Sequence, residues 1–67
     1  MNVYVLKIIR HYTNENIITL YYKHIGYLSI VTLVSNISNA AVFKTKKAAN
    51  EVNKKLGNKY LVEALIR

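Results

Sequence analysis

Side chains that usually carry out catalysis are scarce in this chain. It contains neither Asp nor Cys, and its three glutamates, Glu15, Glu51 and Glu63, fall in a predicted turn, a helix and a strand. Its two histidines, His11 and His24, lie near predicted strand ends, without a carboxylate or thiolate at the spacing of metal ligands. The sequence therefore predicts a non-enzymatic protein with no catalytic residue, no metal and no cofactor.

Cations surround the predicted start of a helix. A helix N-terminus carries partial positive charge and normally favours Asp or Glu, yet Lys44, Lys46 and Lys47 stand there beside Thr45, the predicted N-cap. Backbone N–H groups in a first helical turn bind anions, and these lysines would deepen the preference. These four residues and Lys54 are a candidate anion or partner surface. Alternatively, the lysines are screened by salt and keep a small apolar domain soluble.

A second candidate surface combines aromatic and basic side chains. Its members are Arg10, Tyr12, Tyr21, Tyr22, Lys23 and Tyr27. Gathered on one face of a sheet, such residues could stack nucleic-acid bases or line a protein interface. Tyrosine is also a favoured strand residue, so simple filling of the core and strands is the alternative interpretation.

Length and charge limit the class of protein. The chain of 67 residues makes a single domain, residues 1–67, and a domain of this size buries only about 60% of its unfolded surface. The net charge of +7 permits contact with nucleic acid, anionic lipid or an acidic protein. The longest apolar stretch, "IGYLSIVTLV", is about half the length of a membrane span. We therefore expect no membrane span and a cytoplasmic location.

Runs of β-branched and aromatic residues predict the strands that position these side chains. They are expected at 3–9, 17–22, 27–34 and 60–66, with a turn or bulge at Gly26. A hairpin between the first two strands would bring Ile8 near Tyr21 and Lys7 near Tyr22. The segment "AAVF", residues 40–43, is predicted to be a short strand or an extended arm.

The helix signal follows Thr45. Ala48, Ala49, Val52 and Leu56 fall on one stripe at 100° per residue, and Gly57 stands where a left-handed residue commonly ends a helix. The element order is β-β-β-(β)-α-β. It predicts an α+β fold, with a three- to five-stranded, mostly antiparallel sheet and one amphipathic helix packed on one face.

One helix covers only one face of such a sheet, so apolar residues on the other face need a partner. The strand predicted from Tyr27 to Val34 is apolar on nearly every residue, with Leu28, Ile30, Thr32 and Val34 on one side. We expect self-association, as a homodimer, or a heteromeric contact to bury this second set.

The last 40 or so residues resemble small early-region accessory proteins of phages that infect low-GC Gram-positive bacteria, staphylococci among them. The resemblance lies in "GYLS", "AAVFKTKKAANEVNKKLG" and "KYLVEAL". Ala40, Phe43, Thr45 and Ala49 stand at the positions of the strand-to-helix pattern, and Val62 and Glu63 stand in the closing strand.

This resemblance implies a phage or mobile-element accessory protein in the cytoplasm of a bacterial host. Such proteins commonly bind a host macromolecule and inhibit or redirect it. A host protein is the preferred partner, and an anti-defence inhibitor would be one instance. A small basic nucleic-acid-binding module is the alternative, and a structural oligomerising protein is a third interpretation.

Overall fold

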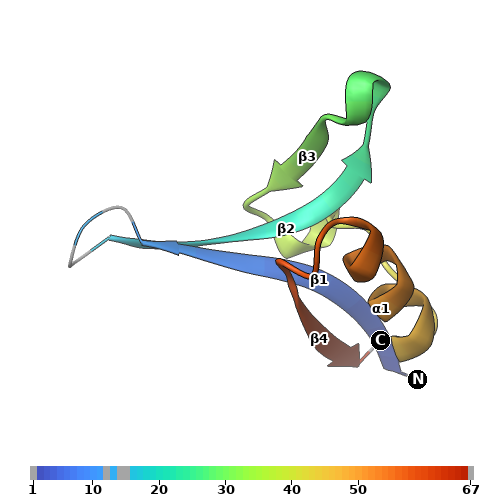
Figure 1. Cartoon of the computed structure of the whole chain (residues 1–67). Helices are drawn as coiled ribbons and strands as arrows, with labels where there is room; N and C mark the ends of the chain where they lie inside the picture. The colour runs from blue at the N-terminus through green and yellow to red at the C-terminus, as the bar shows by residue number, and fades with distance from the viewer. Residues whose placement is uncertain (1, 12, 14–15, 67) are drawn as a thin grey trace.

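A computed structural model of the chain describes residues 2–11, 13 and 16–66. Its strands form one four-stranded antiparallel sheet in the order β3-β2-β1-β4, and the helix α1 (Lys46–Lys55) packs against β1 and β4 (Figure 1). The strands are β1 (Asn2–His11), β2 (Ile17–Ile25), β3 (Val31–Val34) and β4 (Leu61–Ile66). The predicted α+β fold is confirmed.

The central strand β1 serves two partners along its length. Its first part, Asn2 to Lys7, pairs with β4, and its second part, Lys7 to His11, pairs with β2. The β1–β2 ribbon projects from the body of the protein on the side away from α1 (Figure 1). β1 therefore has a paired strand on both of its edges only near Lys7, in the middle of its length.

The predicted register of the first hairpin is wrong by one residue. Lys7 pairs with Tyr21 and Ile8 pairs with Leu20. A slip of one residue would turn a whole strand over. The observed register places Tyr22 on the same side of the sheet as Leu6, and both join the core.

The third strand begins later than predicted. Residues Tyr27–Ser29 form a short 3₁₀ turn, η1, and only Val31–Val34 pair with β2. The backbone N–H of Gly26 donates to the carbonyl of Ile30 at 2.7 Å and closes a tight loop. This closure confirms the turn predicted at Gly26 and removes residues 27–30 from the strand. A bulge between Tyr22 and His24 further interrupts the β2–β3 pairing.

Local signals place α1 as predicted. The Thr45 hydroxyl accepts a hydrogen bond from the N–H of Ala48 at 3.1 Å, as an N-cap does. At the other end Gly57 has φ of +90°, the left-handed conformation that suits glycine. The extended segment before the helix makes a two-hydrogen-bond bridge between Phe43 and Tyr4.

The core lies between α1 and the sheet, and it is small. Leu6, Tyr22, Ala49 and Tyr60 form its buried cluster. Tyr22 stacks on Phe43 and meets Tyr60 edge-on, with ring centroids 6.4 Å apart in both pairs. Aromatic contacts of this kind add roughly 0.5–1.5 kcal/mol each beyond the area that they bury.

Asn53 ties the end of α1 to the start of β4. Its side-chain amide donates to the carbonyl of Tyr60 at 2.8 Å, and its side-chain oxygen accepts from the N–H of Tyr60 at 3.0 Å. The amide therefore satisfies both backbone groups of a buried residue, as a neighbouring strand would. This contact holds the Tyr60 ring in the core.

We predict that Asn53→Ala lowers the free energy of unfolding by about 1–3 kcal/mol, because it leaves two part-buried backbone groups of Tyr60 without partners. Urea unfolding followed by circular dichroism measures the loss. The matched control is Asn50→Ala, an exposed position of the same helix, which should change stability by no more than about 0.5 kcal/mol. Equal effects of the two substitutions would contradict this role of Asn53.

Candidate binding surfaces

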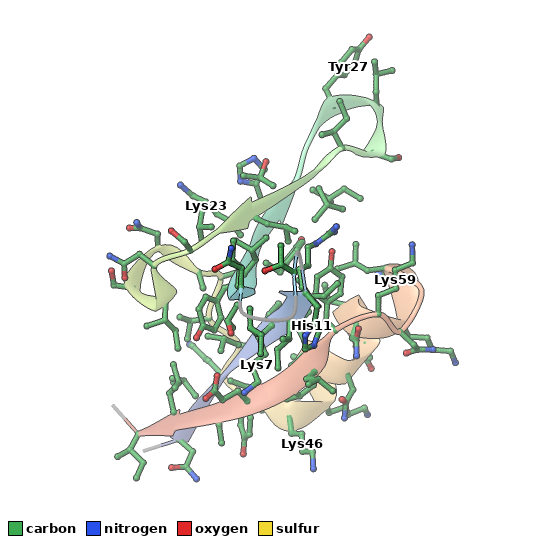
Figure 2. The ribbon with its side chains drawn as sticks, turned by 90° about the vertical axis from the view of Figure 1, so that its left-hand side faces the viewer. Lys7, His11, Lys23, Tyr27, Lys46 and Lys59 are labelled. Carbon is green, nitrogen blue, oxygen red and sulfur yellow. The ribbon has the colours of Figure 1, made fainter. Side chains whose placement is uncertain are left out.

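Four large, exposed apolar side chains lie together at the end of the β2–β3 hairpin. We call residues 25–30 the hairpin tip. Within it, Ile25 is 50% exposed, Tyr27 88%, Leu28 75% and Ile30 63%. Figure 2 shows Tyr27 at the far end of the molecule from Lys46, beyond the last paired residues of the hairpin. The tip therefore presents a continuous apolar segment of chain to its surroundings.

The backbone of the hairpin tip is closed and strained. Beyond the Gly26–Ile30 hydrogen bond, the N–H of Ile30 contacts the carbonyl of Tyr27 at 3.4 Å. Leu28 and Ser29 both adopt left-handed conformations, with φ of 61° and 59°. That conformation costs roughly 1–2 kcal/mol for a residue with a Cβ. The loop thus holds the apolar side chain of Leu28 in solvent and its backbone in a left-handed conformation. Both are unfavourable for leucine.

Polar groups at the base of the tip are basic or neutral. Lys23 occupies the bulge of β2, and the His24 ring lies 3.3 Å from the hydroxyl of Thr32 across the hairpin. The described carboxylates belong to Glu51 of α1 and Glu63 of β4, and neither element pairs with the hairpin tip. A surface that receives the tip would therefore be apolar at its centre, and acidic groups at its rim would suit Lys23.

The lysines predicted at the helix start are exposed and close together in sequence. Lys44, Lys46 and Lys47 are all exposed beside the Thr45 cap. The cap occupies the N–H of Ala48, so the N–H groups of Lys46 and Lys47 are the ones that the first helical turn leaves for an anion. Lys54 lies in the last turn of α1, about 12 Å further along the helix axis at 1.5 Å per residue. The structure does not bring Lys54 to the helix start.

The predicted aromatic and basic surface is divided among separate regions. Tyr22 is only 8% exposed and belongs to the core, whereas Tyr21, the adjacent strand residue, points to the opposite face of the sheet. Arg10 lies on the projecting ribbon and Tyr27 at the hairpin tip. Tyr12 lies outside the described residues. The described members of this set do not form one stacking platform, because Tyr21 and Tyr22 alternate between faces and the others lie in separate regions.

The sheet face away from α1 forms a third surface, which we call the bare sheet face. Alternation from the core residue Leu6 assigns its members. They are Val3, Val5, Lys7, Ile9, His11, Ile17, Thr19, Tyr21, His24, Thr32, Val34, Leu61, Glu63 and Leu65. Thr32 and Val34 were predicted to share this side with Leu28 and Ile30, but the last two belong to the hairpin tip.

An ion pair lies in the middle of the bare sheet face. Lys7 Nζ is 3.6 Å from Glu63 Oε2, with side chains 27% and 33% exposed. That carboxylate oxygen is buried and accepts no hydrogen bond from the described residues. Beside this pair Val5 is fully buried although it is not part of the cluster under α1, and Leu61 is 56% exposed.

Sequence reasoning placed a turn at Gly26 but missed the 3₁₀ turn at residues 27–29, because "YLSIVTLV" is a strand pattern throughout. Ser29 was the available signal, since serine tolerates turn conformations. Among the described residues no group of three or more His, Asp or Glu could hold a metal ion, and no helix is long and apolar enough to cross a membrane. The chain matches no protein-family model, no curated protein and no solved structure.

We predict that Leu28→Gly is more stable than Leu28→Ala by about 1 kcal/mol. Both remove the same exposed side chain beyond Cβ, but only glycine relieves the left-handed strain. Urea unfolding of the two variants measures the difference. Leu28→Ala as stable as Leu28→Gly would mean that residue 28 is not left-handed in solution.

Proposed function

We propose that this chain is a non-enzymatic accessory protein that docks on a partner protein through the hairpin tip and thereby inhibits or redirects it. In the phage or mobile-element setting that the sequence resemblance implies, the partner is a protein of the bacterial host. The observation that carries the proposal is the exposure of Tyr27, Leu28 and Ile30 together in a closed, strained loop.

The apolar and aromatic side chains of the tip favour a protein as its partner. Large apolar and aromatic side chains that fill a pocket supply most of the energy of a protein interface. Strained, exposed conformations persist where the surrounding structure enforces them, and they cluster at functional sites. A loop already closed by its own hydrogen bonds loses little conformational entropy on docking.

The total surface also supports a binding role. The chain exposes 5075 Å², whereas a compact protein of its mass exposes about 4,300 Å². The excess is similar to the area of about 800 Å² that each partner buries in an ordinary protein interface. This excess supports a role in which a partner covers part of the exposed surface.

Nucleic-acid binding is the second candidate function, and the exposed lysines at the helix start favour it. Phosphate contacts from Lys44, Lys46 and Lys47 would make the affinity fall linearly with the logarithm of the salt concentration. Docking of the apolar tip would depend much less on salt. The two functions therefore use opposite ends of the molecule and respond differently to salt (Figure 2).

We predict that tagged protein retains one host protein from the lysate of a low-GC Gram-positive bacterium, with or without nuclease treatment. A tip variant, Tyr27→Ser with Leu28→Ser, should lose at least about 90% of this retention, because truncating a tyrosine hot spot alone costs about 2 kcal/mol at protein interfaces. A lysine variant, with Lys44, Lys46 and Lys47 changed to Glu, is the control for the surface at the helix start. It should retain the host protein as wild type does.

Loss of all retained material after nuclease treatment would contradict the proposal and favour nucleic acid. If the lysine variant loses the host protein and the tip variant still retains it, the docking site lies at the helix start instead. Circular dichroism of both variants confirms that they are folded before the comparison is made.

A further inference from the structure

We propose that the outer edge of β4 binds an extended, acidic peptide segment of another protein, which joins the four-stranded sheet as a fifth strand antiparallel to β4. The acidic residues of the segment follow its extended part and lie beside the lysines at the end of α1. This site is separate from the hairpin tip and does not depend on the proposed function. It rests on the backbone groups of β4, on the regularity of that strand and on the charge beside it.

The outer edge of β4 offers a row of backbone hydrogen-bonding groups. Among the described residues, β4 is the last strand of the sheet and has β1 as its neighbour on one side. The N–H and the carbonyl of Tyr4 both bond to Phe43, on the edge of β1 that faces away from β4. Tyr4 and Ala64 are therefore a non-hydrogen-bonded pair, and the N–H and carbonyl of Ala64 point out of the sheet. By alternation, those of Val62 and Ile66 do the same.

This edge lacks the features by which natural sheets prevent the addition of further strands. Protected edges are short, bulged or covered, or they carry lysine or proline. The six residues of β4 pair with β1 without a register shift and include neither lysine nor proline. Their one charged residue, Glu63, forms an ion pair with Lys7 on the neighbouring strand. Ala64 is exposed and Ile66 is 88% exposed, so α1 leaves the edge accessible.

The opposite edge of the sheet is less regular. β3 has four residues, pairs with β2 across a bulge, and lies between the short 3₁₀ turns η1 and η2 (Ile37–Asn39). A partner strand therefore finds a regular template at β4 and an interrupted one at β3.

Charge beside the edge decides which kind of strand fits. The two hydrogen bonds between Asn53 and Tyr60 fix the last turn of α1 at the start of β4. Lys54, Lys55 and Lys59 lie in that turn and in the loop that follows, and all three are exposed. Figure 2 shows Lys59 beside the start of β4. An acidic segment balances these charges, whereas a second copy of this chain, with its net charge of +7, adds more lysines.

The direction of the added strand follows from the same charges. Antiparallel pairing matches the rest of the sheet and places the C-terminal part of the segment opposite the start of β4. The acidic residues of the segment therefore come after its extended residues. Glu51, one turn earlier on α1, offsets one of the three lysine charges and leaves an excess of two.

Two labelled synthetic peptides test the site on the intact chain. The first alternates threonine and valine over six residues and ends in three glutamates. The second carries the three glutamates in front of the same six residues. Fluorescence anisotropy should show that the first binds at least about fivefold more tightly, because only the first places its carboxylates beside the lysines at the end of α1. Equal affinities would contradict the proposed direction and the contact with these lysines.

A proline on the edge tests the backbone contact. Ala64→Pro removes the outward N–H of residue 64 but no hydrogen bond to β1, and proline is tolerated where the N–H of an edge strand faces solvent. Ala64→Val keeps that N–H and is the matched control. The proline variant should bind the first peptide at least about tenfold more weakly than the valine variant, because it lacks a donor and its ring obstructs pairing.

Charge reversal tests the lysines. Changing Lys54, Lys55 and Lys59 to Glu should weaken binding of the first peptide at least about thirtyfold. The matched control reverses the same number of charges at the three lysines of the helix start. It should weaken binding by less than about threefold at 0.15 M salt, where charges more than about 8 Å apart are largely screened. Equal losses in the two variants would contradict a local contact.

Hydrogen exchange gives a readout that needs no variant. An excess of the first peptide should slow exchange of the Val62 and Ala64 amides at least about tenfold, because each gains a hydrogen-bond acceptor. The amide of Gly26, at the hairpin tip, should exchange at the same rate with and without the peptide.

Three further results would overturn the proposal. The first is unchanged exchange at Val62 and Ala64 with the first peptide in millimolar excess. The second is folded Ala64→Pro that binds this peptide as tightly as Ala64→Val does. The third is a dimer of the wild-type chain in sedimentation velocity that Ala64→Pro dissociates, because a second copy then occupies the edge.

Discussion

Burial of Leu6 between the sheet and the single helix is the constraint on which the rest of the structure depends. Leu6 is fully buried at the point where β1 passes from β4 to β2, and Ala49 of α1 lies against the same cluster. The small alanine lets the helix approach the sheet closely, and Tyr22 and Tyr60, whose rings contact each other, complete the cluster. Everything beyond this cluster, the β1–β2 ribbon and the hairpin tip included, is held by strand pairing with little core beneath it.

A core of this size limits what the chain can stabilise alone. About half the residues are apolar, but one helix shields only one side of the sheet, so apolar side chains remain at the tip and on the bare sheet face. The two surfaces differ in kind. The tip is narrow, closed and strained, which suits insertion into a pocket, whereas the bare sheet face is broad and carries the Lys7–Glu63 ion pair at its centre.

Features governed by local rules could be predicted from the sequence, and features governed by distant contacts could not. Thr45 and Gly57 mark the two ends of α1 because capping depends on neighbouring backbone groups. The sheet register and the start of β3 depend on which side chains reach the core and on one hydrogen bond from Gly26 to Ile30. The same limit explains the candidate surfaces: the lysines at the helix start are adjacent in sequence and stay together, while the tyrosines separate because Tyr21 and Tyr22 face opposite ways.

Native-state hydrogen exchange at the amide of Gly26 tests most directly whether the hairpin tip is already closed in the isolated chain. This amide donates to the carbonyl of Ile30 at 2.7 Å in the isolated chain. The account predicts protection similar to that of the Ala41 amide, which bonds the carbonyl of Tyr22 within the body at 2.9 Å. Exchange of Gly26 at the rate of an unfolded peptide, with Ala41 still protected, would contradict a preformed tip.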